Sequence, residues 1–233
     1  MKLTIFEKRP LGQAVIEYSL VLALLVIVVI VVLARFGITL RDSYCTVVSG
    51  LGGDYCKHYC QDDFKDGKGW TQLNKNSWTI SNGQMCNKNP NEQRVYNSCS
   101  SQNKLTDYSV NLKNTQLMQG NGYGVFVRMA STAPTNGIVF QYDPGLNGFV
   151  FRKWVNGWEV NPALAFKAMP GYKWYDKPHD ITVKVQGNTY TAYVDGAAVL
   201  SATDNTYSSG SVGLRTWDST KMCTGGMSVD PLP

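Results

Sequence analysis

The chain has few of the side chains from which catalytic sites are built. It contains only two histidines, and neither lies in a motif that would activate a serine or cysteine nucleophile. After residue 12 it contains only three glutamates: Glu17, Glu92 and Glu159. Hydrolysis of a glycoside requires two carboxyl groups at a defined separation. Asp143 and Glu159 flank one hairpin-like segment, but nothing in the sequence ties them together. We therefore expect no catalytic activity.

Positive charge and metal-ligand clusters are also scarce. The formal net charge is +5, and part of this excess lies in the first twelve residues, so the sequence does not predict nucleic-acid binding. Cys56 and Cys60 flank His58, which is part of a zinc-ligand pattern, but the chain has only one other histidine. The sequence therefore predicts no zinc centre.

Cysteine is absent before Cys45 and occurs six times from there on. All six cysteines follow the apolar segment near the N-terminus. This distribution is typical of a chain whose later part lies in an oxidising space, where disulfides persist. The even number is consistent with three bridges.

Polar residues are absent from residues 20–34, which form one continuous apolar run. Residues 14–34 are long enough to cross a hydrocarbon core of about 30 Å at about 1.5 Å per residue. Basic residues precede the run, which predicts a cytoplasmic N-terminus. A secretory signal peptide would have a shorter apolar region of about 7–15 residues that ends in small residues, whereas this run is followed by Arg35 and Phe36.

The apolar pattern continues beyond this run at helical spacing. A helix of about 3.6 residues per turn would carry the following residues on one face: Phe36, Leu40, Tyr44, Val47, Val48 and Leu51. An anchor that only crosses the membrane does not need such a stripe. The pattern therefore predicts a helix over residues 13–52 that packs against copies of itself.

Glu17 interrupts the start of the apolar segment, where an unpaired carboxylate is costly. One interpretation is a side chain that reaches water at the membrane interface. The neighbouring residues favour a functional role. KRPLG precedes the bond between Gly12 and Gln13, and QAVIEY follows it, with Tyr18 directly after Glu17. Leader, glycine, Glu-Tyr pair and apolar run at this spacing resemble the processing site of type IV pilins of the Flp/Tad class.

That resemblance covers residues 8–51 and implies cleavage by a prepilin peptidase after Gly12. Residues 1–12 would then be a leader, and Gln13 the first mature residue. Glu17 and Tyr18 would be the assembly residues of the family. In a filament, Glu17 would pair with the amine at Gln13 of a neighbouring subunit, so neither charge would be left alone in an apolar core. Flp pilins are little more than this helix, whereas the present chain carries a large further domain.

A change of composition marks the start of that domain. Gly50, Gly52 and Gly53 end the helical pattern, and residues 53–61 form a cysteine-bearing linker. From residue 62 onward, alternating segments between turns predict strands: YGVFVRM, GIVFQY, GFVFRKW, DITVKV, TYTAYV and GSVGLRTW. Asp195-Gly196 predicts a two-residue hairpin turn. The fold class expected is α+β, with a long N-terminal hydrophobic helix followed by an all-β jelly roll at residues 62–233.

Two longer segments resemble the concanavalin A-like, laminin-G-like jelly rolls. DDFKDGKGWTQLNKNSWTISNGQM is similar to the opening of that family, and ITVKVQGNTYTAYVDGAAVLSATDNTYSSGSVGLRTWDS is similar to its closing strands. The resemblance implies a fold but no particular activity, because lectins, glycosidases and passive spacers share it. No strand carries the Glu-x-Asp-x-x-Glu arrangement of its glycosidases.

Alternation along the predicted strands sorts their side chains into two sets. One set is apolar and predicts the core: Val125, Val127, Phe149, Phe151, Ile181, Val183, Val185, Tyr190, Ala192, Val194, Val212 and Leu214. The other combines flat aromatic rings with hydrogen-bond donors, which a sugar requires because its C–H faces stack on rings and its hydroxyl groups need partners. This candidate glycan-binding set comprises Arg128, Gln141, Arg152, Trp154, Tyr193, Arg215 and Trp217. The alternative is that these aromatic residues cover a second sheet or a neighbouring subunit.

Two further expectations concern the ends of the jelly roll. Asp62, Asp63 and Asp66 offer oxygen ligands for a structural calcium ion, and ordinary surface turns are the alternative explanation. Cys86 and Cys99 bracket a polar insertion and are expected to close it with a disulfide. The other four cysteines allow three pairings. We prefer Cys60 with Cys223, on neighbouring first and last strands, and Cys45 with Cys56.

The function expected is that of a structural subunit of a Flp/Tad-like pilus, with the jelly roll displayed outside and available for contact with glycans or surfaces. Its partners would be copies of itself, the inner membrane before assembly and a prepilin peptidase, with no nucleic acid and no cofactor. Its location would change from a membrane-inserted precursor to an extracellular filament. The alternative is a single-pass, membrane-anchored carbohydrate-binding protein that does not polymerise.

Overall fold

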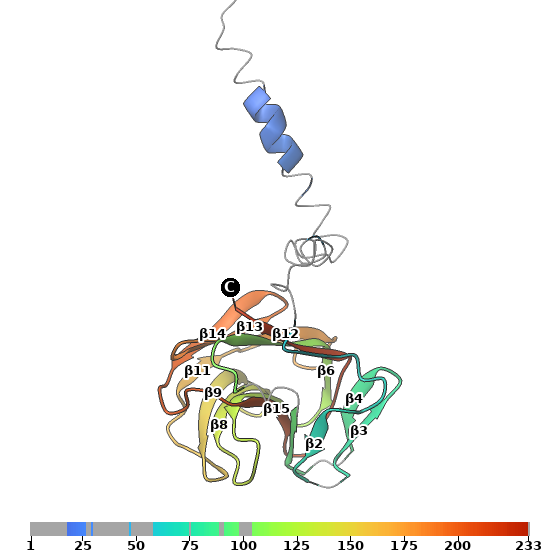
Figure 1. Ribbon diagram of the computed structural model, residues 1–233, viewed down its shortest axis with the longest axis vertical. Helices are drawn as coiled ribbons and strands as arrows, with labels where there is room; N and C mark the ends of the chain where they lie inside the picture. Colours follow the sequence, from blue (N-terminus) through green and yellow to red (C-terminus); the bar gives the residue numbers. More distant parts are fainter. Residues whose placement is uncertain are drawn as a thin grey trace, which may run out of the picture. The chain divides into compact units, whose positions relative to one another are not determined.

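The computed structural model describes residues 18–26, 29, 47, 58–74, 76–88, 91–97 and 104–232. The chain consists of two compact units, Met1–Cys56 and Lys57–Pro233. The second unit thus starts inside the linker range predicted from the sequence, and its first strand starts at Cys60. Figure 1 shows the second unit as two curved sheets that face each other.

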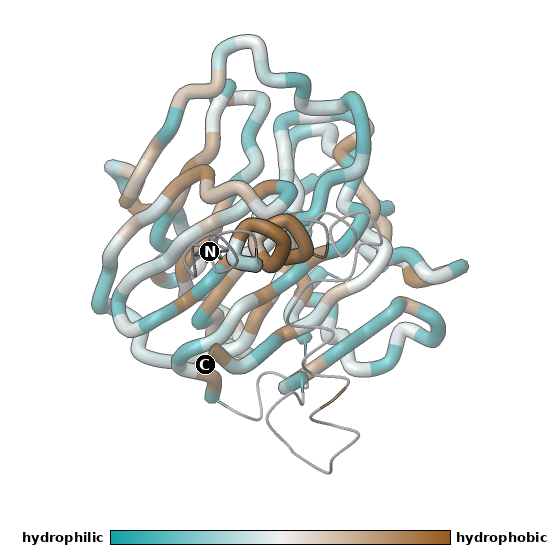
Figure 2. Tube along the Cα trace, turned by 90° about the horizontal axis from the view of Figure 1, so that it is seen from above, coloured by the Kyte–Doolittle hydropathy of each residue, from teal (hydrophilic) through white to brown (hydrophobic). Residues whose placement is uncertain are grey.

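In the first unit, residues 18–26 are helical and uniformly apolar after Tyr18 and Ser19 (Figure 2). None of the helices among the described residues is both long and apolar enough to span a membrane. The exposed fraction of the large apolar side chains here runs from 51% at Val29 to 75% at Tyr18.

The expected α+β class with a long N-terminal helix is therefore wrong, because the part of the chain that the structure describes is mostly β. The physical reason is that an apolar stripe shows which face of a helix could be buried, without supplying the surface that buries it. The predicted leader at residues 1–12, its cleavage bond Gly12–Gln13 and the carboxylate of Glu17 lie outside the described residues.

One layer of the second unit is a nine-stranded sheet with the order β14-β13-β12-β6-β16-β4-β3, in which β17 pairs with β6 and β1 pairs with β17. Its strands are β1 Cys60–Asp62, β3 Trp78–Ser81, β4 Gln84–Asn87, β6 Tyr108–Gln119, β12 His179–Gln186, β13 Thr189–Val194, β14 Ala197–Thr203, β16 Lys221–Thr224 and β17 Gly226–Pro231.

The other layer is an eight-stranded sheet with the order β10-β9-β8-β7-β15-β5-β2, in which β11 also pairs with β9. Its strands are β2 Trp70–Gln72, β5 Gln93–Asn97, β7 Tyr123–Met129, β8 Gly137–Asp143, β9 Gly148–Val155, β10 Trp158–Glu159, β11 Ala165–Ala168 and β15 Ser211–Thr216. All the strand pairs are antiparallel, as the turn-rich sequence predicts for a jelly roll.

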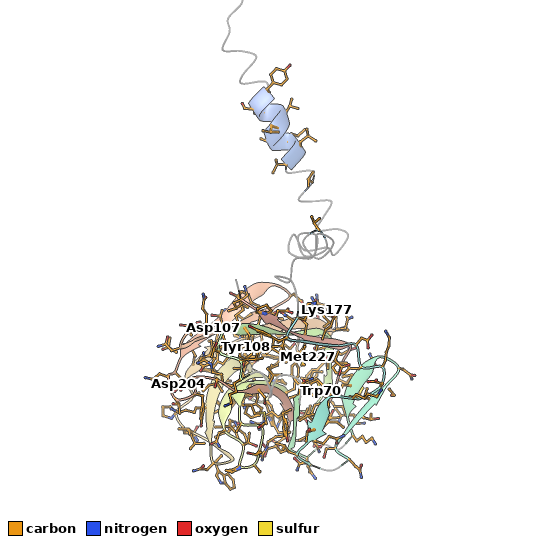
Figure 3. All side chains as sticks on the ribbon, in the orientation of Figure 1. Trp70, Asp107, Tyr108, Lys177, Asp204 and Met227 are labelled. Carbon is orange, nitrogen blue, oxygen red and sulfur yellow. A yellow bond between two sulfur atoms is a disulfide. The ribbon has the colours of Figure 1, made fainter. Side chains whose placement is uncertain are left out.

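The core lies between the sheets and confirms the sorting of side chains by alternation. Tyr108 and Met227 point into it from the nine-stranded sheet (Figure 3). The predicted apolar set is buried there in full: Val125, Val127, Phe149, Phe151, Ile181, Val183, Val185, Tyr190, Ala192, Val194, Val212 and Leu214. Period-two alternation succeeds because a strand inside a two-layer sandwich has one face toward the core.

Local geometry explains one prediction that succeeded and one strand that was missed. The Asp195-Gly196 turn joins β13 to β14, and both residues have positive φ, as a tight hairpin turn of this kind requires. β6, the longest strand, is absent from the predicted set. Asn114 interrupts its alternation with a φ of 49°, next to a shift of register against β12. A bulge of this kind hides a strand from any search for strict alternation.

The disulfide expectations are wrong where the structure tests them. Cys86 is bonded to Cys223, with 4.2 Å between their Cα atoms. These cysteines are direct partners in the β4–β16 register. β1 does lie beside the last strand, as expected, but Cys60 faces Val229 of β17. Sheet register therefore decided the pairing. Cys60 is itself in a disulfide, and Cys45, Cys56 and Cys99 lie outside the described residues.

Candidate functional site

On the outer face of the eight-stranded sheet, glycines in and just before β7 let neighbouring groups approach the backbone closely. Gly124 lies opposite Gln141 of β8 and Arg215 of β15. A Cβ atom on Gly124 would lie 2.7 Å from Val139 Cγ2 and 3.0 Å from Arg215 Cγ. One on Gly122 would lie 2.2 Å from the carbonyl oxygen of Tyr142. A larger residue at either position would push these neighbouring groups away from the backbone.

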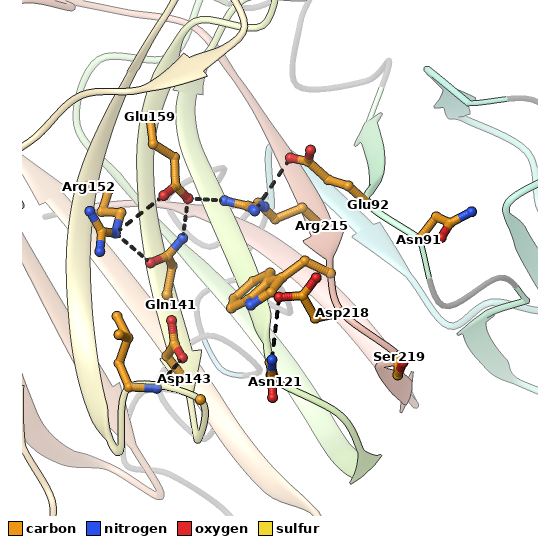
Figure 4. Close-up of a pocket in the computed structure, with 13 residues that line it drawn as sticks. Asn91, Glu92, Asn121, Gln141, Asp143, Arg152, Glu159, Arg215, Asp218 and Ser219 are labelled. Carbon is orange, nitrogen blue, oxygen red and sulfur yellow. Dashed lines mark hydrogen bonds and ion pairs between the residues drawn. The ribbon is translucent and has the colours of Figure 1, made fainter.

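A pocket of about 670 Å³ lies on this face of the sheet. Its lining is mostly polar and comes from β8, β9, β10, β15 and nearby loops (Figure 4). The lining residues are Asn91, Glu92, Asn121, Gln141, Asp143, Gly145, Leu146, Arg152, Glu159, Arg215, Trp217, Asp218 and Ser219.

Arg215 is the central group of the pocket floor. Its guanidinium carbon lies 4.6 Å from the ring centre of Trp154 and 4.4 Å from that of Trp217. Its edge forms an ion pair with Glu159 and another with Glu92, the latter at 3.4 Å. A planar, delocalised cation is suited to this combination of stacking and ion pairing.

A second set of polar contacts links β8, β9 and β10. Gln141 donates a hydrogen bond from Nε2 to Glu159 Oε1 at 2.7 Å and accepts one from Arg152 Nε at 3.1 Å. Arg152 also donates to Asn161 Oδ1 at 2.9 Å. Because Gln141 is buried and uses both ends of its amide, it holds Arg152 and Glu159 in place beside the pocket.

The two carboxyl groups that flank the β9–β10 hairpin in sequence meet in this pocket, and their surroundings differ. Burial raises the pKa of Asp143 to about 6, against a hydrogen bond from the Leu146 amide that lowers it. Burial also acts to raise the pKa of Glu159, but the charge of Arg215 and the hydrogen bonds that Glu159 accepts hold it below its ordinary value. Glu159 is thus ionised at neutral pH with its oxygens engaged, whereas Asp143 titrates near pH 6.

Of the seven residues predicted to bind a glycan, the structure brings four together in the pocket: Gln141, Arg152, Arg215 and Trp217. Trp154 is buried beside them and packs between Arg215 and Arg94.

The remaining two lie elsewhere. Tyr193 belongs to the nine-stranded sheet, where Lys184 covers its ring at 5.0 Å. Arg128 is buried with a φ of 47°, next to a register shift between β7 and β15. Its guanidinium donates to the carbonyl oxygens of Thr106, Gly187 and Tyr207. Alternation could not place Tyr193 because each sheet has its own outer face, and it could not place Arg128 because the irregular backbone of β7 turns this residue toward Tyr108 and Tyr190.

Several lining residues were not among the predicted site residues. They are Asn91, Glu92, Asn121, Asp143, Gly145, Leu146, Glu159, Asp218 and Ser219. Most lie in loops or at strand ends, where alternation carries no information. Asp143 and Glu159 are separated by a hairpin in the chain, and only the pairing of β10 with β9 places Glu159 on the face that carries Trp154.

The aspartates considered for calcium make other contacts. Asp62 accepts hydrogen bonds from the Phe64 amide and from Trp70 Nε1. Asp63 pairs with Lys65, and Asp66 pairs with Lys68 at 3.2 Å. Within the ranges that the structure describes, no group of three or more histidine, cysteine, aspartate or glutamate side chains could hold a metal ion.

The chain matches no protein-family model, and no curated protein matches it. Solved structures do match the β unit. The carbohydrate-binding module CBM66 from Bacillus subtilis aligns with a TM-score of 0.58 and 21% identity, over 69% of this chain and 95% of that one. The mannose- and Ca²⁺-bound luminal domain of VIP36 aligns with a TM-score of 0.61 and 11% identity, over 76% of this chain and 91% of that one. The β-glucanase of Bacillus licheniformis aligns with a TM-score of 0.52 and 15% identity, over 74% of this chain and 98% of that one.

These likenesses confirm the expected jelly-roll fold of the concanavalin A-like type. At such low identity they show the fold alone, because a binding module, a lectin domain and a hydrolase share it. The function must therefore be argued from the pocket.

Proposed function

We propose that the β unit binds carbohydrate in the pocket on the outer face of its eight-stranded sheet. The observation that carries this proposal is the combination, in one pocket, of a half-buried indole with amide and carboxylate groups that converge from several strands. A sugar ring offers C–H groups for the indole and hydroxyl groups for the polar lining. The binding module and the lectin domain among the similar structures support this choice of ligand class.

The test is a glycan array followed by calorimetry on the best sugar, using the full chain in a detergent without a sugar headgroup. We expect Trp217→Ala to weaken binding roughly tenfold, because it removes the aromatic contact of the pocket. Tyr193→Ala is the matched control, since it removes an aromatic ring from the outer face of the other sheet. Equal losses from the two variants would contradict the proposed site.

We propose that binding is not accompanied by hydrolysis. Oε1 of Glu159 accepts hydrogen bonds from Gln141 and Arg215, and Oε2 lies 3.5 Å from Arg152 Nε, so both oxygens are engaged by protein groups rather than poised to attack a sugar. The expected result is that a bound oligosaccharide is recovered intact after prolonged incubation. Release of new reducing ends, abolished in Asp143→Asn, would instead assign acid–base catalysis to this pocket.

We also propose that binding needs no calcium. The lining of the pocket is rich in carboxylates, but each of Glu92 and Glu159 already has a cationic partner. Sugar affinity should therefore be unchanged after treatment with EDTA. A loss of affinity that added Ca²⁺ restores would assign a metal to the site.

A second function is favoured by the N-terminal sequence. Gly12, Gln13, Glu17 and Tyr18 keep the spacing of a Flp/Tad prepilin site, and on this basis we propose that the sugar-binding unit is displayed on a pilus-like filament. The Cys86–Cys223 disulfide supports a location in an oxidising space outside the cytoplasm. The N-terminal sequence of protein recovered from cell surfaces separates the two cases. A start at Gln13 supports the filament, and a retained Met1 supports a single-pass anchor.

A further inference from the structure

The guanidinium groups of the pocket are already committed to partners within the protein. Arg215 is 6% exposed, lies against the indole rings of Trp154 and Trp217, and forms ion pairs with two carboxylates. Arg152 is 15% exposed and donates to Gln141 and Asn161. Figure 4 shows these contacts converging on Glu159 from both sides. Arg215 is therefore not arranged to receive an acidic group from a ligand, and Arg152 already shares its charge with Glu159, 3.5 Å from its Nε.

Two carboxylates of the pocket, unlike the guanidinium groups, each keep an oxygen that accepts no hydrogen bond from a described residue. Asp143 uses Oδ1 to accept a hydrogen bond from the Leu146 amide at 2.8 Å, and Asp218 uses Oδ2 to accept one from Asn121 at 3.3 Å. The second oxygen of each carboxylate accepts no hydrogen bond from the residues that the structure describes. Both residues line the pocket, so these oxygens are available to hydroxyl groups that donate to them.

The balance of charge points the same way. The lining carries four carboxylates, Glu92, Asp143, Glu159 and Asp218, against two guanidinium groups. A third guanidinium group, that of Arg94, pairs with Glu92 at 3.4 Å, so four negative charges face three positive ones. A ligand anion would add to this negative excess. At about 6 Å and an effective dielectric constant of about 40, one uncompensated pair of like charges corresponds to roughly a tenfold loss of affinity.

We propose that the pocket selects neutral sugars, whose hydroxyl groups donate to Asp143 and Asp218, and rejects acidic sugars such as uronic acids. This inference rests on the proposed carbohydrate-binding function and specifies the ligand class of that site. It requires that a carboxylate in place of a hydroxymethyl group is unfavourable for reasons of charge rather than size.

The experiment uses pairs of oligosaccharides that differ only at C6, as CH₂OH or as carboxylate, in the gluco, galacto and manno series. The methyl ester of each uronate is a third member that is bulkier but uncharged. Calorimetry with the full chain should show that the best neutral sugar binds at least about tenfold more tightly than its uronate. The ester should recover most of this difference, and raising the salt concentration to about 0.5 M should narrow it.

Two variants locate the effect. Asp143→Asn should narrow the gap between neutral sugar and uronate several-fold, because it removes one negative charge and keeps the side-chain shape. Asp180→Asn is the control, since it removes the same charge from an exposed residue of the nine-stranded sheet. A uronate that binds as tightly as its neutral partner, or a gap that esterification and salt leave unchanged, would overturn the inference. If no sugar of any class binds, the proposed function itself fails and the inference fails with it.

Discussion

Three arginines of the β unit show how surroundings decide what a guanidinium group does. Arg128 is buried and donates mostly to main-chain carbonyl oxygens, so it joins loops and strands that would otherwise leave these acceptors unpaired. Arg215 is equally buried but stacked and ion-paired at the pocket floor. Arg152 is more exposed and orients Gln141. All three lie near aromatic residues in sequence, which is why their roles look alike before folding.

Asp143 is a carboxyl group that destabilises the folded protein when it is ionised. A pKa raised from 3.8 to about 6 corresponds to about 3 kcal/mol of unfolding free energy. The folded state holds this proton more tightly than the unfolded state does. Protonated Asp143 therefore stabilises the folded state relative to the ionised form. This stabilisation is complete below about pH 4 and is lost as the pH rises through about 6.

We therefore expect Asp143→Asn to raise the free energy of unfolding by up to about 3 kcal/mol at pH 8 and by little at pH 4. The neutral amide keeps an oxygen to accept the hydrogen bond of the Leu146 amide. Urea denaturation at the two pH values measures the difference. Asp180→Asn, at an exposed position, is the control. A gain of the same size at both pH values would show that burial of the charge is not its cause.

At the scale of elements, the β3–β4 hairpin depends on a short contact with the rest of its sheet. β4 meets β16 over two residue pairs, one of which is Cys86 with Cys223. Asn87 adds side-chain hydrogen bonds with the carbonyl oxygen of Thr220 and the amide of Met222. The disulfide therefore closes the sheet where strand pairing alone is weak, and it joins residues 137 positions apart.

Replacing both cysteines by serine should lower the free energy of unfolding by roughly 2–5 kcal/mol, because a long loop of the unfolded chain is released. Native-state hydrogen exchange should show the largest loss of protection in β3 and β4. The matched control is a double substitution of similar size on the exposed face of the β13–β14 hairpin, Thr191→Ser with Ser201→Thr. Peptide mapping without reductant that finds Cys86 bonded to a residue other than Cys223 would contradict the premise.

At the scale of the whole molecule, the proposed display of the β unit on a filament depends on residues outside those that the structure describes. The prediction therefore rests on sequence. Glu17→Gln removes the negative charge and keeps the side-chain length, so the amine at Gln13 of a neighbouring subunit would lose its partner. Breaking a buried ion pair from one side costs about 3–5 kcal/mol.

We expect this variant to be made and cleaved normally but to give few filaments, measured by shearing cells and quantifying the released protein. N-terminal sequencing of the cellular pool should still begin at Gln13. A normal filament yield would count against the assembly role of Glu17. Cleavage that fails in the variant would show that Glu17 acts in processing instead.

The sequence by itself determined the features that depend on local pattern. Alternation identified β7 and β13 residue for residue, and it assigned the core faces of the strands it found. The Asp195-Gly196 pair predicted the hairpin turn in which it lies, because positive φ at both positions favours these residue types. The mainly apolar composition of residues 18–26 was visible in the same way.

Only the tertiary structure decided which outward-facing side chains lie on the same sheet. A jelly roll has two outer faces, so Tyr193 and Arg152 are equally outward in sequence and lie on different sheets. Bulges at Asn114 and Arg128 shift the alternation that a pattern assumes. The pocket and the disulfide join residues far apart in the chain, such as Glu92 with Arg215 and Cys86 with Cys223. Contacts of this kind are set by strand order and register, which short-range patterns do not encode.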